Sequence, residues 1–193
     1  MVSNLPSAPA RPAPGKKKLA AVLGSIGAAV ALFVSVPADE SGRKVEATVQ
    51  PSGAITVRHT SGPQYLKVYL DAVKIPTACD GITKGMRLGQ VYTEAQCTAK
   101  LEEELVIHAE GVIACVPGLY GRQHQAAAAV SLAYNIGVGA FCRSTVARRF
   151  NAGRWREGCD GFAAWKMAGG RVLAGLVARR GRERNVCLTG LPA

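Results

Sequence analysis

The fold is decided by the stretch YLKVYLDAVKIPTACDGIT, residues 65–83. Tyr65, Lys67 and Tyr69 alternate with apolar residues, as in a strand, and Asp71 follows where the strand should end. A Pro-bounded turn then leads to Thr77, six residues after the carboxylate. A carboxylate at a strand-to-turn corner with a nearby hydroxyl is a compact way to build a polar site. On pattern alone, an Asx-type turn with a solvent-facing hydroxyl is the commoner explanation, so the flanking sequence has to decide.

Composition places the chain among globular proteins, because 48% of its 193 residues are hydrophobic and 19% are charged. Once the N-terminus is set aside, the remainder suits one domain with a sizeable core. The formal net charge of +11 favours an anionic partner, namely nucleic acid, an anionic lipid surface or a cell-wall polymer. Aromatic residues make up only 6% of the chain and no RNA-binding or finger motif is present, so nucleic acid is not expected.

All cysteines lie downstream of residue 78, at Cys79, Cys97, Cys115, Cys142, Cys159 and Cys187. No pair has the C-x-x-C spacing and no neighbouring histidine completes a metal set, so a zinc site is not expected. An even count is typical of disulfides in an oxidising compartment, and the pairing stays open. Buried free thiols in a cytosolic protein are the alternative, and the N-terminus of this chain argues against it.

The N-terminus has the features of a segment that directs export. Residues 1–15 are rich in Pro, Ala and Ser, which predicts disorder. Three lysines at 16–18 precede an uncharged run at 19–36, as in an export signal or a first membrane helix with its N-terminus inside. No clear cleavage site follows. Half of the run is small or weakly apolar, so lipid should hold it only marginally. An anchor, a releasable anchor and a cleaved signal stay open, and this composition favours the releasable anchor.

After the apolar run the pattern predicts a small β-rich lobe. Residues 44–50 and 54–59 flank Pro51-Ser52-Gly53 as the two strands of a hairpin, and residues 65–70 form the next strand.

The second half is predicted to be helical. A capping box at 93–96 opens a helix through about residue 114, with Leu101, Leu105, Ile107 and His108 on its apolar side. Further helices are expected at 123–136, 141–150, 159–167 and 172–185. This order is α+β, and a functional site is expected in a cleft between the two lobes.

Three segments of the second half carry a resemblance to a known family. SLAYNIGVGAFCRSTVARRFNAG at 131–153, W-x-x-A-G-G at 165–170 and R-R-x-R-E-R at 179–184 resemble the phage-type lysozymes of glycoside hydrolase family twenty-four, and in particular the lambdoid endolysins. The resemblance covers roughly residues 65–188. The apolar run is similar to the signal-arrest-release segment of secreted endolysins in that branch.

The resemblance implies a lysozyme-like α+β fold with a helical C-terminal lobe. It divides the chain into a disordered basic N-terminus at 1–18, a transmembrane-like signal anchor at 19–37 and a lysozyme-like catalytic domain at 38–193. No cofactor or metal is implied. The implied partners are peptidoglycan glycan strands and, through residues 19–36, the inner membrane, with the protein a monomer in the periplasm of a Gram-negative host.

The working residues of that family are a Glu, an Asp nine residues later and a Thr six residues after the Asp. Asp71 and Thr77 fit the last two positions, but Gly62 stands where the Glu is expected. The family's acid usually ends the first helix as Glu-Gly, and Glu40-Ser41-Gly42 occupies that place here. Residues 44–64 would then be an inserted hairpin. Glu40 as a mere helix-end charge is the alternative.

Two other carboxylates are weaker candidates for the acid. Glu46 should face solvent from the hairpin, and Asp80 lies beside Cys79. A disulfide at Cys79 would influence the site directly, because Thr77 is only two residues away.

The implied activity is hydrolysis of the β-1,4 bond between N-acetylmuramic acid and N-acetylglucosamine. Glu40 would be the general acid, with its pKa raised by an apolar cleft wall. Asp71 would stay ionised and Thr77 would hold the water. While residues 19–36 occupy the bilayer, Glu40 should be unable to reach its place. An inactive peptidoglycan-binding module, suggested by Gly62, and a lytic transglycosylase, opposed by Asp71 and Thr77, are the competing functions.

Overall fold

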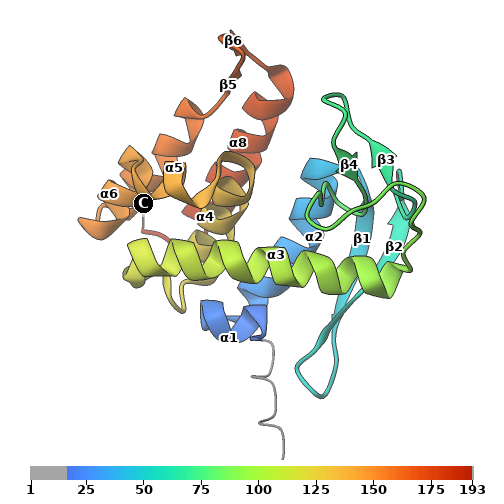
Figure 1. The fold of residues 1–193 in the computed structure, drawn as a ribbon. Helices are drawn as coiled ribbons and strands as arrows, with labels where there is room; N and C mark the ends of the chain where they lie inside the picture. The colour runs from blue at the N-terminus through green and yellow to red at the C-terminus, as the bar shows by residue number, and fades with distance from the viewer. Residues whose placement is uncertain (1–16, 193) are drawn as a thin grey trace, which may run out of the picture.

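The structure, a computed structural model, describes residues 17–192 and consists of a β-rich lobe and a helical lobe. The helix α3 (Glu94–Cys115) runs beneath both lobes and joins them (Figure 1). Thr93 begins it with the predicted capping box, in which its hydroxyl accepts from the Gln96 N–H. The α+β class is therefore confirmed. The disorder predicted for residues 1–15 lies outside the described residues.

The apolar run is not one helix, which corrects the prediction of a continuous helix through residues 19–37. It forms α1 (Leu19–Leu23) and α2 (Ile26–Glu40). Gly24 ends α1 with a φ of +65°, and the Ser25 hydroxyl caps α2 by accepting from the Ala28 N–H. Among the described residues no helix combines the length and the hydrophobicity needed to cross a membrane.

The β-rich lobe holds two antiparallel hairpins. The strands β1 (Lys44–Val49) and β2 (Ile55–Ser61) pair as predicted, and an exposed ion pair between Glu46 and Arg58 confirms that Glu46 faces solvent. The second hairpin joins β3 (Tyr69–Leu70) to β4 (Pro76–Thr77). The strand predicted from Tyr65 is thus shorter, although a single bridge pairs Lys67 with Val91.

The helical lobe is built on α4 (Gln123–Ile136), a buried helix that ends at Gly137 as predicted. The remaining helices and strands are η1 (Pro117–Leu119), α5 (Val138–Cys142), α6 (Thr145–Asn151), α7 (Trp155–Asp160), η2 (Gly161–Ala164), β5 (Met167–Ala168), β6 (Arg171–Val172) and α8 (Ala174–Leu188).

Two helix predictions in this lobe need correction. The predicted helix at 141–150 is two helices, because Ser144 interrupts it and caps α6 by accepting from the Ala147 N–H. The predicted helix at 159–167 stops early, because the chain turns into the β5–β6 hairpin at Met167. Gly169 and Gly170 at the tip of that hairpin both have positive φ, a conformation that glycine adopts without strain.

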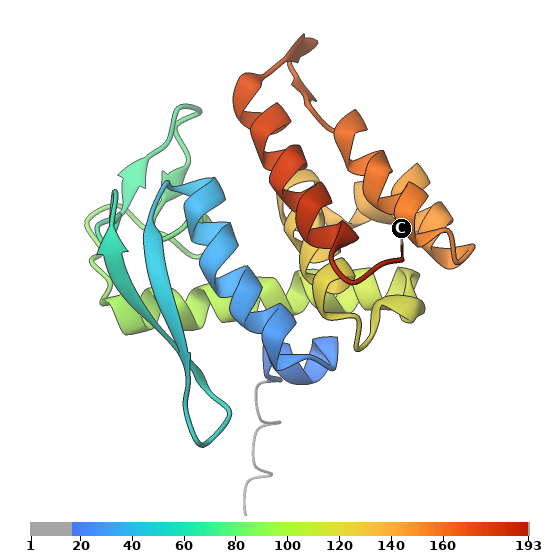
Figure 2. The same ribbon diagram turned by 180° about the vertical axis from the view of Figure 1, so that it is seen from behind.

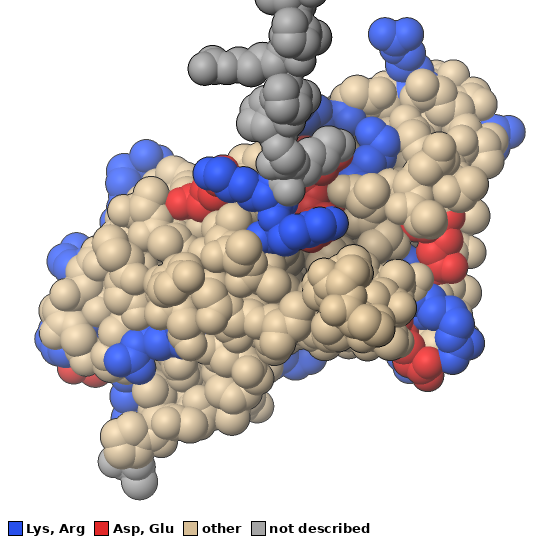
Figure 3. Space-filling view, turned by 90° about the horizontal axis from the view of Figure 1, so that it is seen from below, with Lys and Arg blue, Asp and Glu red and all other residues tan. Residues whose placement is uncertain are grey.

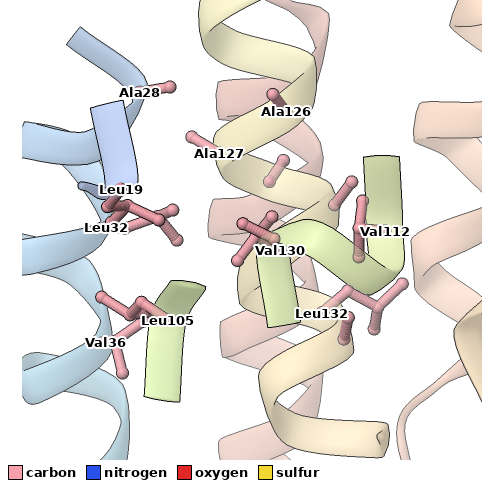
Figure 4. Close-up of a cluster of buried hydrophobic side chains, with 14 of the residues drawn as sticks. Leu19, Ala28, Leu32, Val36, Leu105, Val112, Ala126, Ala127, Val130 and Leu132 are labelled. Carbon is pink, nitrogen blue, oxygen red and sulfur yellow. The ribbon is translucent and has the colours of Figure 1, made fainter. Parts of the chain in front are cut away.

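One hydrophobic core spans the described residues, and α1 and α2 contribute to it. Figure 4 shows Leu19, Leu32 and Val36 directed toward Leu105 of α3 and Val130 of α4, and all five side chains are buried. Leu101 and Leu105 lie on the buried side of α3 as predicted. Ile107 does not, since it is 46% exposed. Residues 19–36 therefore pack as part of the lysozyme-like core in this structure, rather than as a separate segment.

The cysteines form three disulfides, so every one of them is paired. Cys79–Cys97 ties the loop after β4 to α3, Cys115–Cys142 ties α3 to α5, and Cys159–Cys187 ties α7 to α8. The expectation of disulfides is confirmed, and the open question of connectivity is answered. Long loops closed in this way lose entropy in the unfolded chain, which stabilises the fold by about 2–4 kcal/mol per bridge.

Candidate active site

Glu40 is the last residue of α2, and its side chain is 21% exposed. Its Oε1 accepts a hydrogen bond of 2.5 Å from Nη1 of Arg179 on α8. The prediction placed this carboxyl against an apolar wall, whereas the structure places it against a guanidinium. Arg179 was not identified from the sequence as a site residue, although the R-R-x-R-E-R segment that contains it was singled out.

Arg179 is almost fully buried and holds several acceptors at once. Besides Glu40 it bonds Oε1 of Glu183 at 3.1 Å and the Ser131 carbonyl at 3.2 Å, and Asp39 lies 3.6 Å away. Burial acts to lower the pKa of Arg179, but the facing carboxylates, led by Glu40, outweigh it and raise the pKa. The guanidinium therefore stays charged and joins the end of α2 to α4 and α8.

The turn after Glu40 is fixed by Asp80. The Ser41 hydroxyl lies 3.0 Å from both the Pro37 carbonyl and Oδ1 of Asp80. Arg43 donates to both oxygens of Asp80, at 2.9 and 2.6 Å. Asp80 is fully buried and both of its oxygens accept from Arg43, so neither oxygen is accessible to a glycan.

Asp71 lies at the end of β3, half-buried, in the Asx-type turn that its position suggested. Its Oδ1 accepts from the N–H groups of Val73 and Ile75, at 2.9 and 2.8 Å. Within residues 17–192 no hydrogen-bond donor meets Oδ2. One oxygen therefore fixes the turn, and the other is available as an acceptor.

Thr77 lies on β4 directly opposite Tyr69 of β3 and is buried. Its hydroxyl donates to the Ile75 carbonyl at 2.9 Å. The hydroxyl proton is thus in use, while the oxygen lone pairs can still accept from a water molecule. Since Asp71 and Thr77 both bond to Ile75, one turn holds both residues.

The loop from Thr77 to Gly81 connects this hairpin to Glu40. Gly81 has a φ of +82°, and a Cβ built there would lie 3.7 Å from the Glu40 Cβ and 3.8 Å from its Oε2. The disulfide at Cys79 fixes the same loop to α3. The structure thus brings the end of α2 against the loop that begins at Thr77.

Tyr134 of α4 completes this polar region. Burial raises the pKa of its phenol, and the Glu40 and Glu104 carboxylates add to that shift. Its ring also contacts His108 with centroids 4.9 Å apart, which confirms that His108 is a packing residue. A pocket of about 250 Å³ lies between the 82–84 loop and α3, and Lys84, Lys100 and Glu104 are among its lining residues.

The chemistry available to these residues is proton transfer. No group of three or more His, Cys, Asp or Glu side chains able to hold a metal ion occurs among residues 17–192. A carboxyl group at the end of a helix, a second carboxylate with a free oxygen and a hydroxyl that can accept from water are the parts of a general acid–base site.

Comparison with known proteins agrees with the sequence resemblance. The sequence model of the family described as Phage lysozyme matches residues 62–183. The SAR-endolysin of Bacteriophage PS119 is 38% identical over 125 residues, which cover 64% of this chain and 74% of that protein.

Two solved structures share the fold. The active form of the P1 phage endolysin Lyz matches with a TM-score of 0.60 and 25% identity, over 66% of this chain and 78% of that one. The P22 lysozyme mutant L86M matches with a TM-score of 0.57 and 33% identity, over 65% of this chain and 88% of that one. Residues 62–183, which the family model matches, include the β3–β4 hairpin and the helical lobe as far as the middle of α8.

Proposed function

The chain belongs to the phage lysozyme family of peptidoglycan-hydrolysing lytic enzymes, and from that premise we propose that Glu40, Asp71 and Thr77 carry out the hydrolysis. The bond cleaved is the β-1,4 link between N-acetylmuramic acid and N-acetylglucosamine. Glu40 replaces the acid that Gly62 cannot supply, and the β1–β2 hairpin is an insertion between the acid and Asp71.

The observation that supports this proposal is the position of Glu40 against the Thr77–Gly81 loop. The two segments are far apart in sequence, yet Gly81 is in van der Waals reach of the Glu40 side chain. A Cβ at residue 81 would narrow the space beside the carboxyl. Arg179 holds Oε1 of Glu40, whereas Oε2 is the oxygen that lies near Gly81.

In the proposed reaction, the proton of the Glu40 carboxyl passes to the glycosidic oxygen as the bond from that oxygen to the anomeric carbon breaks. A water molecule adds to the anomeric carbon, and its proton goes to Oδ2 of Asp71, the oxygen that the turn leaves free. The Thr77 oxygen accepts the second O–H of that water. Asp71 also offsets positive charge on the sugar ring in the transition state.

The proposed location is the periplasm, which the protein reaches through its apolar N-terminal run. We propose that residues 19–36 first insert into the inner membrane and later leave it to form α1 and α2. Leu19, Leu32 and Phe33 are fully buried in the core, so the core offers these side chains an apolar alternative to lipid. While the run stays in the bilayer, Glu40, only four residues beyond it, cannot meet Arg179.

The catalytic proposal is tested by Glu40→Gln on purified peptidoglycan. Loss of a general acid is expected to lower the rate by about 10²–10⁴-fold. Glu46→Gln, which removes an exposed carboxylate on the inserted hairpin, is the matched control and should retain full activity. Full activity of Glu40→Gln would remove Glu40 from the reaction.

The competing functions give different results. A wild-type protein that binds but does not solubilise peptidoglycan would be an inactive binding module. Mass analysis of the released sugars distinguishes hydrolysis, which leaves a reducing end, from transglycosylation, which leaves an anhydro end. For the membrane step, a fusion of residues 1–40 to a periplasmic reporter is expected to leave the membrane when the membrane potential is lost. A fusion that stays would contradict release.

A further inference from the structure

The outward face of the β-rich lobe is both apolar and basic. Tyr65, Lys67 and Tyr69 are spaced two apart, so their side chains leave the same face of the chain, while Val68 between them is buried. Val91 pairs with Lys67 and therefore extends this face. The face ends at the turn that carries Arg87 and Leu88. We call it the outer β face, defined by Tyr65, Lys67, Tyr69, Arg87, Leu88 and Val91.

The apolar side chains of this face are unusually open to solvent. Val91 is 67% and Leu88 59% exposed, and the rings of Tyr65 and Tyr69 contact each other in a tilted arrangement with centroids 4.9 Å apart. Single exposed apolar residues are common on protein surfaces, but a contiguous group is typical of an interaction site.

The turn that carries Leu88 is held in place. The Gln90 N–H donates to the Arg87 carbonyl at 3.2 Å, and the Gln90 side-chain oxygen accepts from the Arg87 N–H at 2.8 Å and from the Tyr92 hydroxyl at 3.0 Å. Gly89 supplies the positive φ of 88° that such a turn needs. The turn that carries Leu88 is therefore already ordered before binding, so less conformational entropy is lost when Leu88 binds a partner.

The charges around this face are positive and unpaired. Residues 62–92 contain Lys67, Lys74, Lys84 and Arg87 as cations and Asp71 and Asp80 as anions. Asp80 is neutralised in its buried pair with Arg43, and Oδ1 of Asp71 is taken by the backbone of its own turn. None of the four cations has an ion-pair partner within residues 17–192. The six residues of the outer β face thus include two cations, Lys67 and Arg87, and no carboxylate.

We propose that the outer β face binds the surface of an anionic phospholipid bilayer. Tyrosines suit the headgroup level, because one end of the ring is apolar and the other is wet. Leu88 and Val91 reach into the acyl boundary, while Lys67 and Arg87 meet the lipid phosphates. A glycan surface is disfavoured, because the two most exposed apolar side chains of the face are aliphatic and a sugar offers them no apolar partner.

The tyrosine end of this face adjoins the proposed site, because Tyr69 pairs with Thr77 and precedes Asp71 by two residues. In Figures 1 and 2 the β3 strand lies on the side of the β-rich lobe that is remote from the helical lobe. On the underside of the molecule, in contrast, Lys and Arg lie in separate groups between wide uncharged areas and are interspersed with acidic residues (Figure 3). Bilayer binding through this face would keep the enzyme at the boundary between the membrane and the wall.

The test is sedimentation of the full chain with vesicles of phosphatidylcholine, with and without phosphatidylglycerol. The double variant Lys67→Gln/Arg87→Gln is expected to lose about 30-fold in partition onto the anionic vesicles, because each cation near such a surface adds about 1 kcal/mol. Leu88→Ser/Val91→Ser is expected to lose about tenfold or more and to bind poorly at every salt concentration. All variants keep residues 19–36, so differences between them do not come from the apolar run.

The β5–β6 hairpin supplies matched controls of similar exposure and charge. Met167→Ser/Val172→Ser removes side chains that are 57% and 56% exposed, and Lys166→Gln/Arg171→Gln removes two cations, all on the helical lobe. These variants should partition like the wild type. All four double variants should hydrolyse soluble glycan oligomers at the wild-type rate, which shows that they are folded.

Three results would overturn the proposal. Equal losses in the outer-face and control pairs would mean that the face is not specific. Equal binding of the wild type to neutral and anionic vesicles would remove the charge argument. Unchanged vesicle binding by the outer-face variants, with weaker sedimentation on insoluble peptidoglycan, would make the face a wall-binding surface instead.

Discussion

Arg179 of α8 donates a 2.5 Å hydrogen bond to Glu40 of α2, across 139 positions of sequence. The contact joins the last residue of the apolar run's helix to the C-terminal helix of the chain. The Arg179 side chain that positions the proposed acid is itself buried, and it bonds Glu183 and the Ser131 carbonyl. The position of Glu40 therefore depends on the packing of the whole helical lobe.

Arg179→Lys is expected to lower both stability and activity. Lysine keeps the charge, but it lacks the planar group that reaches Glu40, Glu183 and Ser131 together. We expect a loss of about 1–3 kcal/mol in the free energy of unfolding, measured by urea denaturation, and a lower kcat. Arg182→Lys is the control, because Arg182 is exposed and, among residues 17–192, bonds Asp39 alone. Similar effects of the two variants would mean that Arg179 has no special part in placing the acid.

Asp80→Asn tests whether the buried pair with Arg43 holds the turn after Glu40. Asparagine keeps the shape of the aspartate side chain but removes the negative charge that balances the Arg43 guanidinium, which is only 3% exposed. Breaking a buried pair in this way is expected to cost about 3–5 kcal/mol, seen as a lower urea midpoint. The exposed pair of Glu46 and Arg58 provides the comparison, since its loss in Glu46→Gln should cost less than about 1 kcal/mol. A small effect at Asp80 would show that the turn does not need this pair.

The Cys79–Cys97 disulfide should affect activity as well as stability. Cys79 lies between Thr77 and Gly81 and has a φ of +56°, so the bridge fixes the loop beside Glu40. Replacing both cysteines by serine is expected to cost about 2–4 kcal/mol and to reduce kcat.

The Cys159–Cys187 bridge, which joins α7 to α8, is the control for this effect. Its removal should cost a similar amount of stability with a smaller change in kcat, compared at a temperature where both variants are folded. Equal losses of kcat in the two variants would show that the Cys79–Cys97 disulfide has no special effect on the site.

Sequence reasoning succeeded where the determining contacts are local. Asp71 and Thr77 could be placed together because one short turn holds both, and the α3 start could be placed because Thr93 and Gln96 cap each other within four residues. It failed where a distant partner decides. The contact of Glu40 with Arg179 depends on how α2 and α8 pack, which no spacing in the sequence encodes.

The prediction of one helix through residues 19–37 was wrong for the same reason. Apolar composition alone does not distinguish a membrane helix from a buried one, and glycine occurs inside both. The break falls at Gly24, where a Cβ would lie 2.7 Å from the ring of Tyr120, almost a hundred residues away. The disulfide pairing could not be predicted from the sequence either, because it depends on the distances between helices in the fold.

Gly24→Ala should destabilise the packed form of the N-terminal run. A Cβ there would lie 2.7 Å from the Tyr120 ring, on a backbone with a φ of +65°. We expect a loss of about 2 kcal/mol or more by urea denaturation. Gly53→Ala is the control, because Gly53 has a similar φ of +77° but a Cβ there would meet nothing within 4 Å. It therefore reports the backbone strain without the steric clash. If both cost the same, the contact with Tyr120 does not hold the break.

The pH dependence of stability should report the buried phenol of Tyr134. Burial, aided by the Glu40 and Glu104 carboxylates, raises its pKa above the value of 10.0 that it has in the unfolded chain. Above pH 10 the unfolded chain therefore releases this proton while the folded chain keeps it, so stability falls as pH rises, by up to about 1.4 kcal/mol per pH unit. Below pH 10 the residue has no such effect.

Tyr134→Phe should remove that part of the alkaline loss and leave the urea midpoint at neutral pH nearly unchanged, because its hydroxyl makes only a long contact of 3.5 Å to the Asp80 carbonyl. The measurement is the urea midpoint of both proteins at intervals from pH 8 to pH 11. Tyr120→Phe is the matched control, since Tyr120 is 60% exposed, and it should follow the wild type. Parallel curves for wild type and Tyr134→Phe would show that the phenol ionises as readily in the folded enzyme as in the unfolded chain. Neither burial nor the carboxylates of Glu40 and Glu104 would then raise its pKa.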